Sequence, residues 1–346
     1  MKHFKKLNIK GFGHMEVFIA VLAIVAVGGI GSYVMLRNSH ALTATGIDVY
    51  NKNEVNSKFK AMVAANVTVR SGWTGSVSDC KPGSISSAAR SAAVQATNFA
   101  RELNDLAPVT AVSLTSTTQA NVQRTALMQA ANFDRGALSH YPPSTWRCYA
   151  TNGDVTSRLS NLGAVFPETT PVNMITQMLD DSGSSNNLVG HRQWLFNPDA
   201  NTFAFGVTKT SGVVQILNLS TDSTNNDPRW VMWPSRGYFP SPLAPGYEIY
   251  GLLTGSSAPR EGHWSISTLE GYNVKSATVT VKRNGSNVPI TIVARTTAEN
   301  RPTVVWSMPT GYSRSGTYSV TISGVISSSG ARVSAYTYPV NFFDPY

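Results

Sequence analysis

The chain has 346 residues, of which 42% are hydrophobic and only 14% are charged, and its formal net charge is +9. This length exceeds one ordinary domain, and low charge with abundant Ser, Thr, Asn and Gly is more typical of exported β-rich proteins than of cytosolic enzymes. Neither a groove-reading motif nor CxxC, HExxH, GxxxxGK or GxSxG occurs, which argues against a nucleic-acid partner and against the commonest redox, zinc-protease, P-loop and hydrolase-elbow chemistry.

The first 37 residues are predicted to be a leader and a transmembrane helix. Four lysines precede Gly11, and residues 17–36 form a run of 20 residues without charge. At 1.5 Å per residue such a helix spans about 30 Å, the thickness of a bilayer core. Because the lysines precede the run and only Arg37 closely follows it, we expect a cytoplasmic N-terminus and extracellular domains.

The segment "KGFGHMEV" resembles a type IV prepilin leader, with Gly11, Phe12 and Glu16 in the corresponding places. That resemblance implies cleavage after Gly11 and a glutamate that aids packing in a filament. A pilin would continue one long helix beyond the membrane, whereas "RNSHALTATGIDV" turns to small and β-prone residues. We therefore favour a membrane anchor, with prepilin-type processing as the second possibility and cleavage after Ala41, at a small-x-small site, as the third.

Residues 38–83 are polar and turn-rich and are predicted to be a linker. The chain has two cysteines, Cys80 and Cys148, and a pair in an exported protein is more often a disulfide than two free thiols. If bridged, they close a loop of about 70 residues, which stabilises the fold by about 4 kcal/mol in the loop-entropy treatment.

Apolar residues at three- and four-residue steps predict helices over about 84–107 and 118–136. A third helix is predicted after Thr170, which suits an N-cap because Pro171 fits the first helical position. "TFAFGV" and "GVVQILNLS" are predicted to be strands. A connector rich in Pro and aromatic residues follows over 219–261.

Residues 262–346 alternate apolar and polar side chains in short runs, and Asn284-Gly285 is a strong hairpin signal. Strands at this spacing favour a β-sandwich of immunoglobulin type. The predicted fold class is therefore α+β, with a helix-and-strand domain before the sandwich.

Two histidines, His140 in "GALSHYPP" and His191 in "LVGHRQW", each follow a helix and precede a turn or strand. The pattern "LSHYPPSTWRCY…RLSNLG…ITQMLDDSGSSNNLVGHRQWLFNP…FAFGV" resembles the CAP superfamily (cysteine-rich secretory proteins, antigen 5 and pathogenesis-related proteins), and most closely its bacterial branch. The resemblance spans about residues 84–210. It implies an α-β-α sandwich over 84–218 with a cleft where the two histidines meet.

Two histidines and two acids often surround the cleft in that family, and some members bind a divalent metal there. The resemblance carries over to His140 and His191, so a metal such as zinc is a candidate ligand. The second acid falls at Asp180 or Asp181, between which the sequence does not choose. His140, His191 and Asp181 are also the candidates for acid/base catalysis.

The first acid does not carry over, because Leu159-Ser160-Asn161 stands where many relatives have Gly-Glu-Asn. With at most one carboxylate, both a general acid/base pair and a metal site are weakened. Arg192 is predicted to pair with a nearby carboxylate or carbonyl, and Trp194 to lie in the core. The residues expected to line the cleft are Ser160, Asn161, Asp180, Asp181 and Arg192.

Three functions follow from these patterns. The first is a membrane-anchored, surface-exposed module that binds a lipid, an anionic wall polymer or a partner-cell surface. The second is a metal-assisted or acid/base hydrolase of envelope polymers or peptides. The third is a minor pilin-like subunit, which would associate with filaments. The binding module is favoured because one of the two acids is missing and because many immunoglobulin-like domains are adhesive.

Overall fold

The computed structural model describes residues 46–133, 138–164, 170–216, 227–246, 261–297 and 301–346. The predicted leader and transmembrane helix lie outside these ranges. Within the described ranges, the structure contains no helix with the length and hydropathy of a membrane span. The predicted mixture of helices and strands is confirmed.

A first sheet has the strand order β1-β3-β4-β2, with β3 antiparallel to β4, β4 antiparallel to β2, and β1 parallel to β3. The predicted strands at "TFAFGV" and "GVVQILNLS" are confirmed as β3 and β4. The bounds are β1 Thr110–Ala111, β2 Asn161–Ala164, β3 Thr202–Val207 and β4 Ser211–Gln215.

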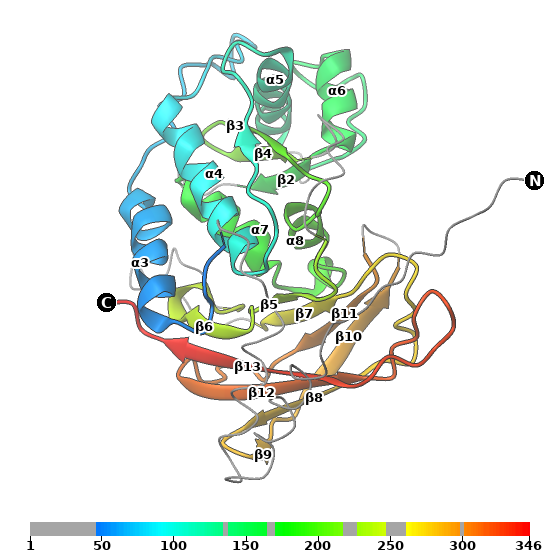
Figure 1. The fold of residues 1–346 in the computed structure, drawn as a ribbon. Helices are drawn as coiled ribbons and strands as arrows, with labels where there is room; N and C mark the ends of the chain where they lie inside the picture. Colours follow the sequence, from blue (N-terminus) through cyan, green and yellow to red (C-terminus); the bar gives the residue numbers. More distant parts are fainter. Residues whose placement is uncertain (1–45, 134–137, 165–169, 217–226, 247–260, 298–300) are drawn as a thin grey trace, which may run out of the picture. The chain divides into compact units, whose positions relative to one another are not determined.

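Helices cover both faces of this sheet: α5 and α6 lie on one side, and α4 and α7 on the other (Figure 1). Helix α5 approaches β3 closely at Gly206, where an added Cβ would lie 2.5 Å from the Val122 carbonyl oxygen. Glycine is therefore required for this packing. The bounds are α4 Ser87–Glu102, α5 Thr117–Ala131, α6 Thr151–Arg158, α7 Pro171–Asp180 and α8 Gly190–Leu195.

Thr170 is confirmed as the N-cap of α7, since its Oγ1 accepts a hydrogen bond from Asn173 N, and Pro171 is the first helical residue. Helix α4 begins later than expected, because the Ser86 hydroxyl accepts from Ala89 N and fixes the cap there. Helices α6 and α8 were not predicted. Each is too short, and α6 too polar, to show a 3.6-residue apolar period.

The described part of the segment predicted to be a linker contains helix α3, Lys52–Met62. Its Val55 and Phe59 are fully buried, and the Phe59 ring lies 5.8 Å from that of Phe99 on α4. The linker prediction is thus corrected over these residues, because two apolar side chains one helical turn apart anchor the segment to the core. The predicted Cys80–Cys148 disulfide is confirmed, and it ties this region to the start of α6.

Two further sheets form the C-terminal part. One has the order β10-β11-β7-β5, and the other β6-β13-β12-β8-β9. They pack face to face, since the Trp264 ring of β7 lies 5.6 Å from Tyr318 on β12 and 5.8 Å from Phe342 on β13. The bounds in the first are β5 Val231–Trp233, β7 His263–Ser267, β10 Thr291–Thr296 and β11 Thr303–Ser307; in the second they are β6 Gly237–Pro240, β8 Thr278–Arg283, β9 Ser286–Asn287, β12 Gly316–Ser323 and β13 Tyr336–Phe343.

The predicted hairpin at Asn284-Gly285 joins β8 to β9, and both residues have positive φ (51° and 82°), as a type I′ turn requires. Strands β5 and β6 come from the segment predicted to be a connector. Each is only three or four residues long, which explains why no alternating pattern marked them.

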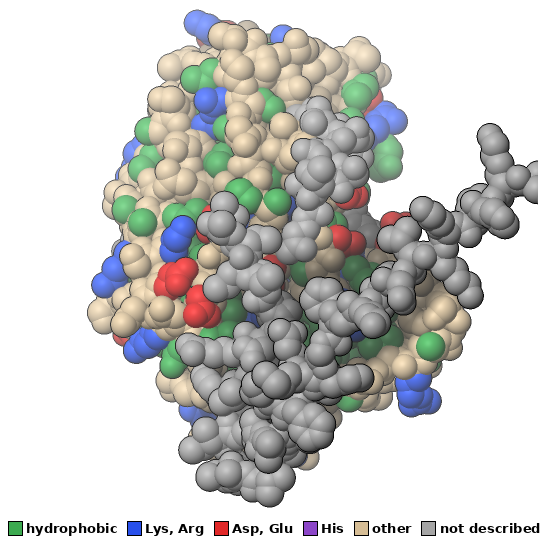
Figure 2. Space-filling model, in the orientation of Figure 1, with side chains coloured by type: hydrophobic (Ala, Val, Ile, Leu, Met, Phe, Trp, Pro, Cys, Tyr) green, Lys and Arg blue, Asp and Glu red, His purple; other side chains and the backbone are tan. Residues whose placement is uncertain are grey.

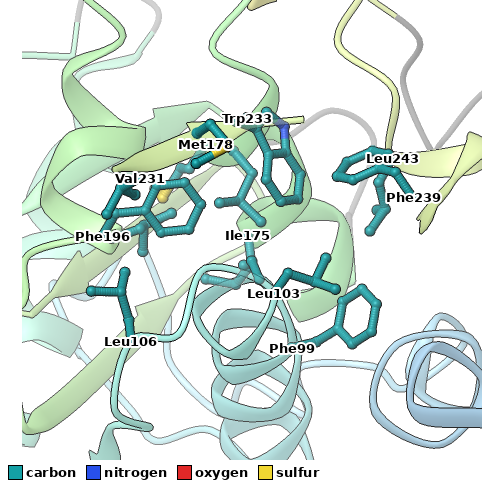
Figure 3. Packing of buried hydrophobic residues seen from close by; sticks show 14 of the residues in the cluster. Phe99, Leu103, Leu106, Ile175, Met178, Phe196, Val231, Trp233, Phe239 and Leu243 are labelled. Atoms are coloured by element: carbon teal, nitrogen blue, oxygen red, sulfur yellow. The ribbon is translucent and has the colours of Figure 1, made fainter. Parts of the chain in front are cut away.

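One hydrophobic core joins the helical and the sheet regions. Figure 3 shows Phe99 of α4, Leu103 just after that helix and Ile175 of α7 converging with Trp233 of β5 and Phe239 of β6. Residues 46–346 accordingly form one compact unit. This packing places β7 beside the C-terminal end of α7, where the candidate site begins.

Candidate functional site

A pocket of about 400 Å³ opens between the end of α6, strands β2 and β4, and the start of α8. His140 and His191 both line it. Arg158, Ser160, Asn161 and Trp194 line it beside them. The remaining described lining residues are Leu159, Ser185, Asn186, Asn187, Leu188, Gly190, Val214 and Ile216.

His191 is held by Asp181 from behind the pocket. Asp181 is the C-cap of α7, in the left-handed conformation (φ 47°), and its side chain is buried. The His191 Nδ1 lies 2.6 Å from Asp181 Oδ1, while Asp181 Oδ2 accepts from Arg192 N at 3.0 Å. Because a carboxylate only accepts, Nδ1 carries the proton, and Nε2 is the second ring nitrogen.

The pKa of His191 is raised above its ordinary value. Burial alone lowers it, but the charge and hydrogen bond of Asp181, together with the nearby Leu162 carbonyl, outweigh burial and favour the imidazolium. Asn161 Nδ2 also donates to the His191 carbonyl at 2.9 Å, which ties β2 to the start of α8. The structure therefore presents an oriented, readily protonated imidazole to the pocket.

His140 is exposed and reaches the pocket from the loop before α6. Its Nδ1 lies 2.7 Å from the Ser157 carbonyl oxygen, so Nδ1 is the donor and Nε2 is left for a ligand. Gln129 of α5 fixes the preceding residue, since its amide bonds both the N–H and the carbonyl of Ser139. The Ser139 hydroxyl accepts from Tyr141 N rather than from His140.

Three residues expected to line the cleft, Asp180, Asp181 and Arg192, instead lie behind it. Arg192 is buried, and its guanidinium donates to the carbonyls of Leu179 (2.6 Å) and Asp180 (2.5 Å) and to Ser265 Oγ of β7 (2.8 Å). Burial lowers its pKa to about 10. The prediction that Arg192 pairs with nearby carbonyls is confirmed, and its role is to join α7, α8 and β7.

Asp180 is buried, and its Oδ1 accepts from Gly246 N at 2.6 Å. Burial, the largest influence, raises its pKa, which the hydrogen bond from Gly246 only partly offsets. Asp180 thus cannot serve as a ligand or base in the pocket. Of the two aspartates between which the sequence did not choose, Asp181 is the one that contacts a histidine.

The described wall of the pocket fits a zinc ion poorly. Zinc sites use three or four protein ligands, whereas this wall offers two imidazoles and no carboxylate or thiol. Asp181 does not supply a third ligand, because it does not line the pocket and binds His191 at Nδ1, on the side away from it. Within the described ranges, no three side chains of His, Cys, Asp and Glu are placed to share an ion.

Ser160 occupies the place where the family resemblance leads one to expect an acid. Its side chain is buried in the pocket wall, only 7% exposed, and its hydroxyl has no hydrogen-bond partner among the described residues. A buried polar group without a partner is costly. Ser160 thus places a buried hydroxyl beside the pocket that no described residue satisfies.

Sequence reasoning missed the rim of the pocket. Arg158 ends α6 and holds Asp154 in a bidentate ion pair, with its guanidinium 5.1 Å from the exposed Tyr141 ring. Trp194, predicted to be core, is half-buried and lines the pocket. His191 and Trp194 share a face of α8, but no sequence signal marked this, because α8 is too short to show a helical period.

The basic residues form no single patch on the face in Figure 2, where they are scattered among uncharged side chains. Any recognition of anions by the described residues on that face thus depends on local sites rather than on a broad field. No model of a known protein family matches the chain, and a comparison with curated proteins finds no relative.

Proposed function

We propose that the protein is a membrane-anchored, surface-exposed binding module. In this proposal a CAP-like α-β-α layer presents the pocket, an immunoglobulin-like sandwich supports it, and residues 17–36 anchor the chain. The helices on both faces of the first sheet and the two packed C-terminal sheets support this architecture. The ligand is a component of the envelope or of a partner cell.

The donor set of the pocket is the observation that carries the proposal. The described wall combines two imidazoles, a guanidinium, amides and a free hydroxyl with apolar side chains, but it has no carboxylate. General acid/base hydrolysis needs two titrating groups with separated pKa values in reach of the substrate, and without a carboxylate in the described wall only the two imidazoles could supply them. Convergent polar groups beside an aromatic ring are instead typical of binding pockets.

Filling the pocket tests the proposal. Gly190 lines it, and a Cβ built there meets nothing within 4 Å, so Gly190→Trp would occupy the space. Full-length protein in neutral nanodiscs would be offered isolated envelope material. We expect capture by the wild type, a loss of at least about tenfold in Gly190→Trp, and unchanged capture in Thr280→Trp on β8. Equal capture by all three would refute the pocket's role.

A second candidate, hydrolysis, is favoured by one observation: the Asp181–His191 pair resembles the carboxylate–imidazole dyads that orient a general base. If the protein is a hydrolase, His191→Ala and Asp181→Asn must both abolish release of products from envelope polymers or peptides. Thermal melting of each variant is the control for folding. Turnover that survives in His191→Ala would exclude this mechanism.

The prepilin-like leader leads to a third proposal, processing as a minor pilin-like subunit. Cleavage after Gly11 would give a mature N-terminus at Phe12 and bring Glu16 close to the chain end. Mass spectrometry of the membrane-bound protein separates this from cleavage after Ala41 and from an uncleaved anchor. A peptide that retains Met1 would exclude prepilin processing.

A further inference from the structure

We propose that the pocket binds a single anionic group, a carboxylate or a phosphate, between His140, His191 and Arg158. The inference rests on the proposed function and names the chemical class of its ligand. It follows from the positions of the hydrogen-bond donors and of the nearby acids. It also departs from the divalent cation that the family resemblance implies.

Both histidines are held from outside the pocket. Ser157 and Asp181, which bind the two Nδ1 atoms, do not line it. His140 therefore offers Nε2 to a ligand. His191 contributes mainly positive charge, because the Leu162 carbonyl also lies beside its ring. When protonated, both rings favour an anion and cannot coordinate a metal through Nε2.

The described acids nearest the pocket bind the cationic side chains but do not line the pocket themselves. Asp181 lies behind His191, and Asp154 holds Arg158 through Nε and Nη2. Arg158 Nη1 is thus left without a partner among the described residues. Its guanidinium is fixed by both the ion pair and the Tyr141 ring, so little freedom is lost when it binds a ligand.

The pocket also has a buried group that needs a partner. Ser160 Oγ lies in the wall, is shielded from water and bonds to nothing among the described residues. A hydroxyl donates to a carboxylate or phosphate oxygen, whereas a zinc site would need an acid at this position. A small rotation of this side chain toward the pocket would let the orphan donor bind an anion held by the cationic side chains.

The pH dependence of binding separates an anion from a cation. Anion binding draws protons onto the imidazoles and strengthens as pH falls, whereas metal binding releases protons and weakens. Among the described residues, the charged groups near His191 are Asp181 and Asp180 at the end of α7, Arg192 on α8 and Arg158 on α6. His140 lines the same pocket, and His263 of β7 lies beside the Asp181 carbonyl. Net proton uptake on binding is expected at His191, whose pKa the Asp181 carboxylate raises.

The test is calorimetric titration of full-length protein in neutral nanodiscs with inorganic phosphate, acetate and zinc chloride. Each is measured at about pH 5.5 and about pH 8, on either side of the ordinary histidine range, in two buffers of different ionisation enthalpy. We expect phosphate or acetate to bind at least about tenfold more tightly at the lower pH, with net proton uptake. His140→Ala and Arg158→Gln should each weaken binding, and Arg332→Gln, which removes an exposed charge elsewhere, should not.

A second arm identifies the source of the anionic group. Vesicles that contain phosphatidylglycerol and isolated anionic wall polymer are compared as competitors of phosphate. Competition by vesicles assigns the group to a lipid headgroup, and competition by polymer assigns it to the wall; either result supports an anion site.

Two outcomes overturn the inference. One is zinc binding with proton release and no anion binding. The other is no anion binding while envelope capture still depends on an open pocket, which leaves the proposed function intact and points to a neutral ligand. If capture also fails in the wild type, the proposed function fails as well.

Discussion

Asp181 connects His191 to the rest of the molecule without entering the pocket. One oxygen holds the imidazole, the other caps the backbone of α8, and its carbonyl lies 3.0 Å from His263 Nδ1 on β7. The residue that gives His191 its charge is thus fixed from three elements. Its left-handed conformation at the end of α7 turns the carboxylate toward α8.

Asp181→Asn is expected to lower the pKa of His191, because the charge that outweighs burial is removed. The pKa of His191 is higher in the folded than in the unfolded state. The stabilisation by the Asp181–His191 pair is therefore fully present at a pH below the unfolded-state pKa, and it is lost as the pH rises through the folded-state pKa. The variant should therefore lose about 2 kcal/mol at mildly acidic pH and less at alkaline pH. NMR titration of the His191 ring measures its pKa, and urea unfolding measures the free energy of unfolding. The exposed Asp79→Asn is the control. An unchanged titration midpoint of His191 in Asp181→Asn would contradict the conclusion that Asp181 raises its pKa.

Helix α7, whose C-cap is Asp181, begins with a side-chain N-cap. The Thr170 hydroxyl accepts from Asn173 N. Thr170→Ala should lower the free energy of unfolding by about 1 kcal/mol, the usual cost of removing such a cap. Thr117→Ala, at the exposed first residue of α5, should cost less than about 0.5 kcal/mol. Equal losses in chemical denaturation would show that the cap contributes nothing.

Elements with a strong local pattern could be predicted from the sequence, and the others could not. Helix α7 has an apolar period, a cap and a proline, and β8 alternates before Asn284-Gly285. Helix α8 and strands β5 and β6 are too short to carry a period, and the tertiary packing determines them. Helix α3 did carry a signal, Val55 and Phe59 one turn apart, in a segment otherwise polar enough to be taken for a linker.

The residues of the candidate site also divide into those that the sequence could predict and those that it could not. Two histidines could be predicted because sequence motifs surround them. The roles of the two aspartates could not be predicted. Asp181 binds His191 and Asp180 bonds to Gly246 because of the direction in which α7 ends, and no pattern of residues indicates that direction. Ser160 was identified from the missing acid, but its orphaned hydroxyl depends on burial from several elements.

At the scale of the whole molecule, the disulfide joins residues 68 positions apart and so constrains the unfolded chain over a long loop. Replacing Cys80 and Cys148 together by serine is expected to cost about 4 kcal/mol in the loop-entropy treatment. Guanidinium unfolding of the double variant beside the oxidised wild type measures the difference. A loss below about 1 kcal/mol would mean that structure in the unfolded state already holds the two segments together.

The shared core predicts how residues 46–346 unfold. Strands β5 and β6 cover apolar side chains of α4 and α7, and Arg192 bonds to Ser265 of β7. Neither the helical layer nor the sandwich can then unfold without exposing the other's buried surface. We expect one cooperative calorimetric transition for the full chain, and Arg192→Met should shift it downward as a whole because it removes three buried hydrogen bonds. Two separate transitions, by contrast, would show that the helical layer and the sandwich are independent domains. If Arg192→Met then shifted only one of them, the stability of the pocket would depend on the helical layer alone.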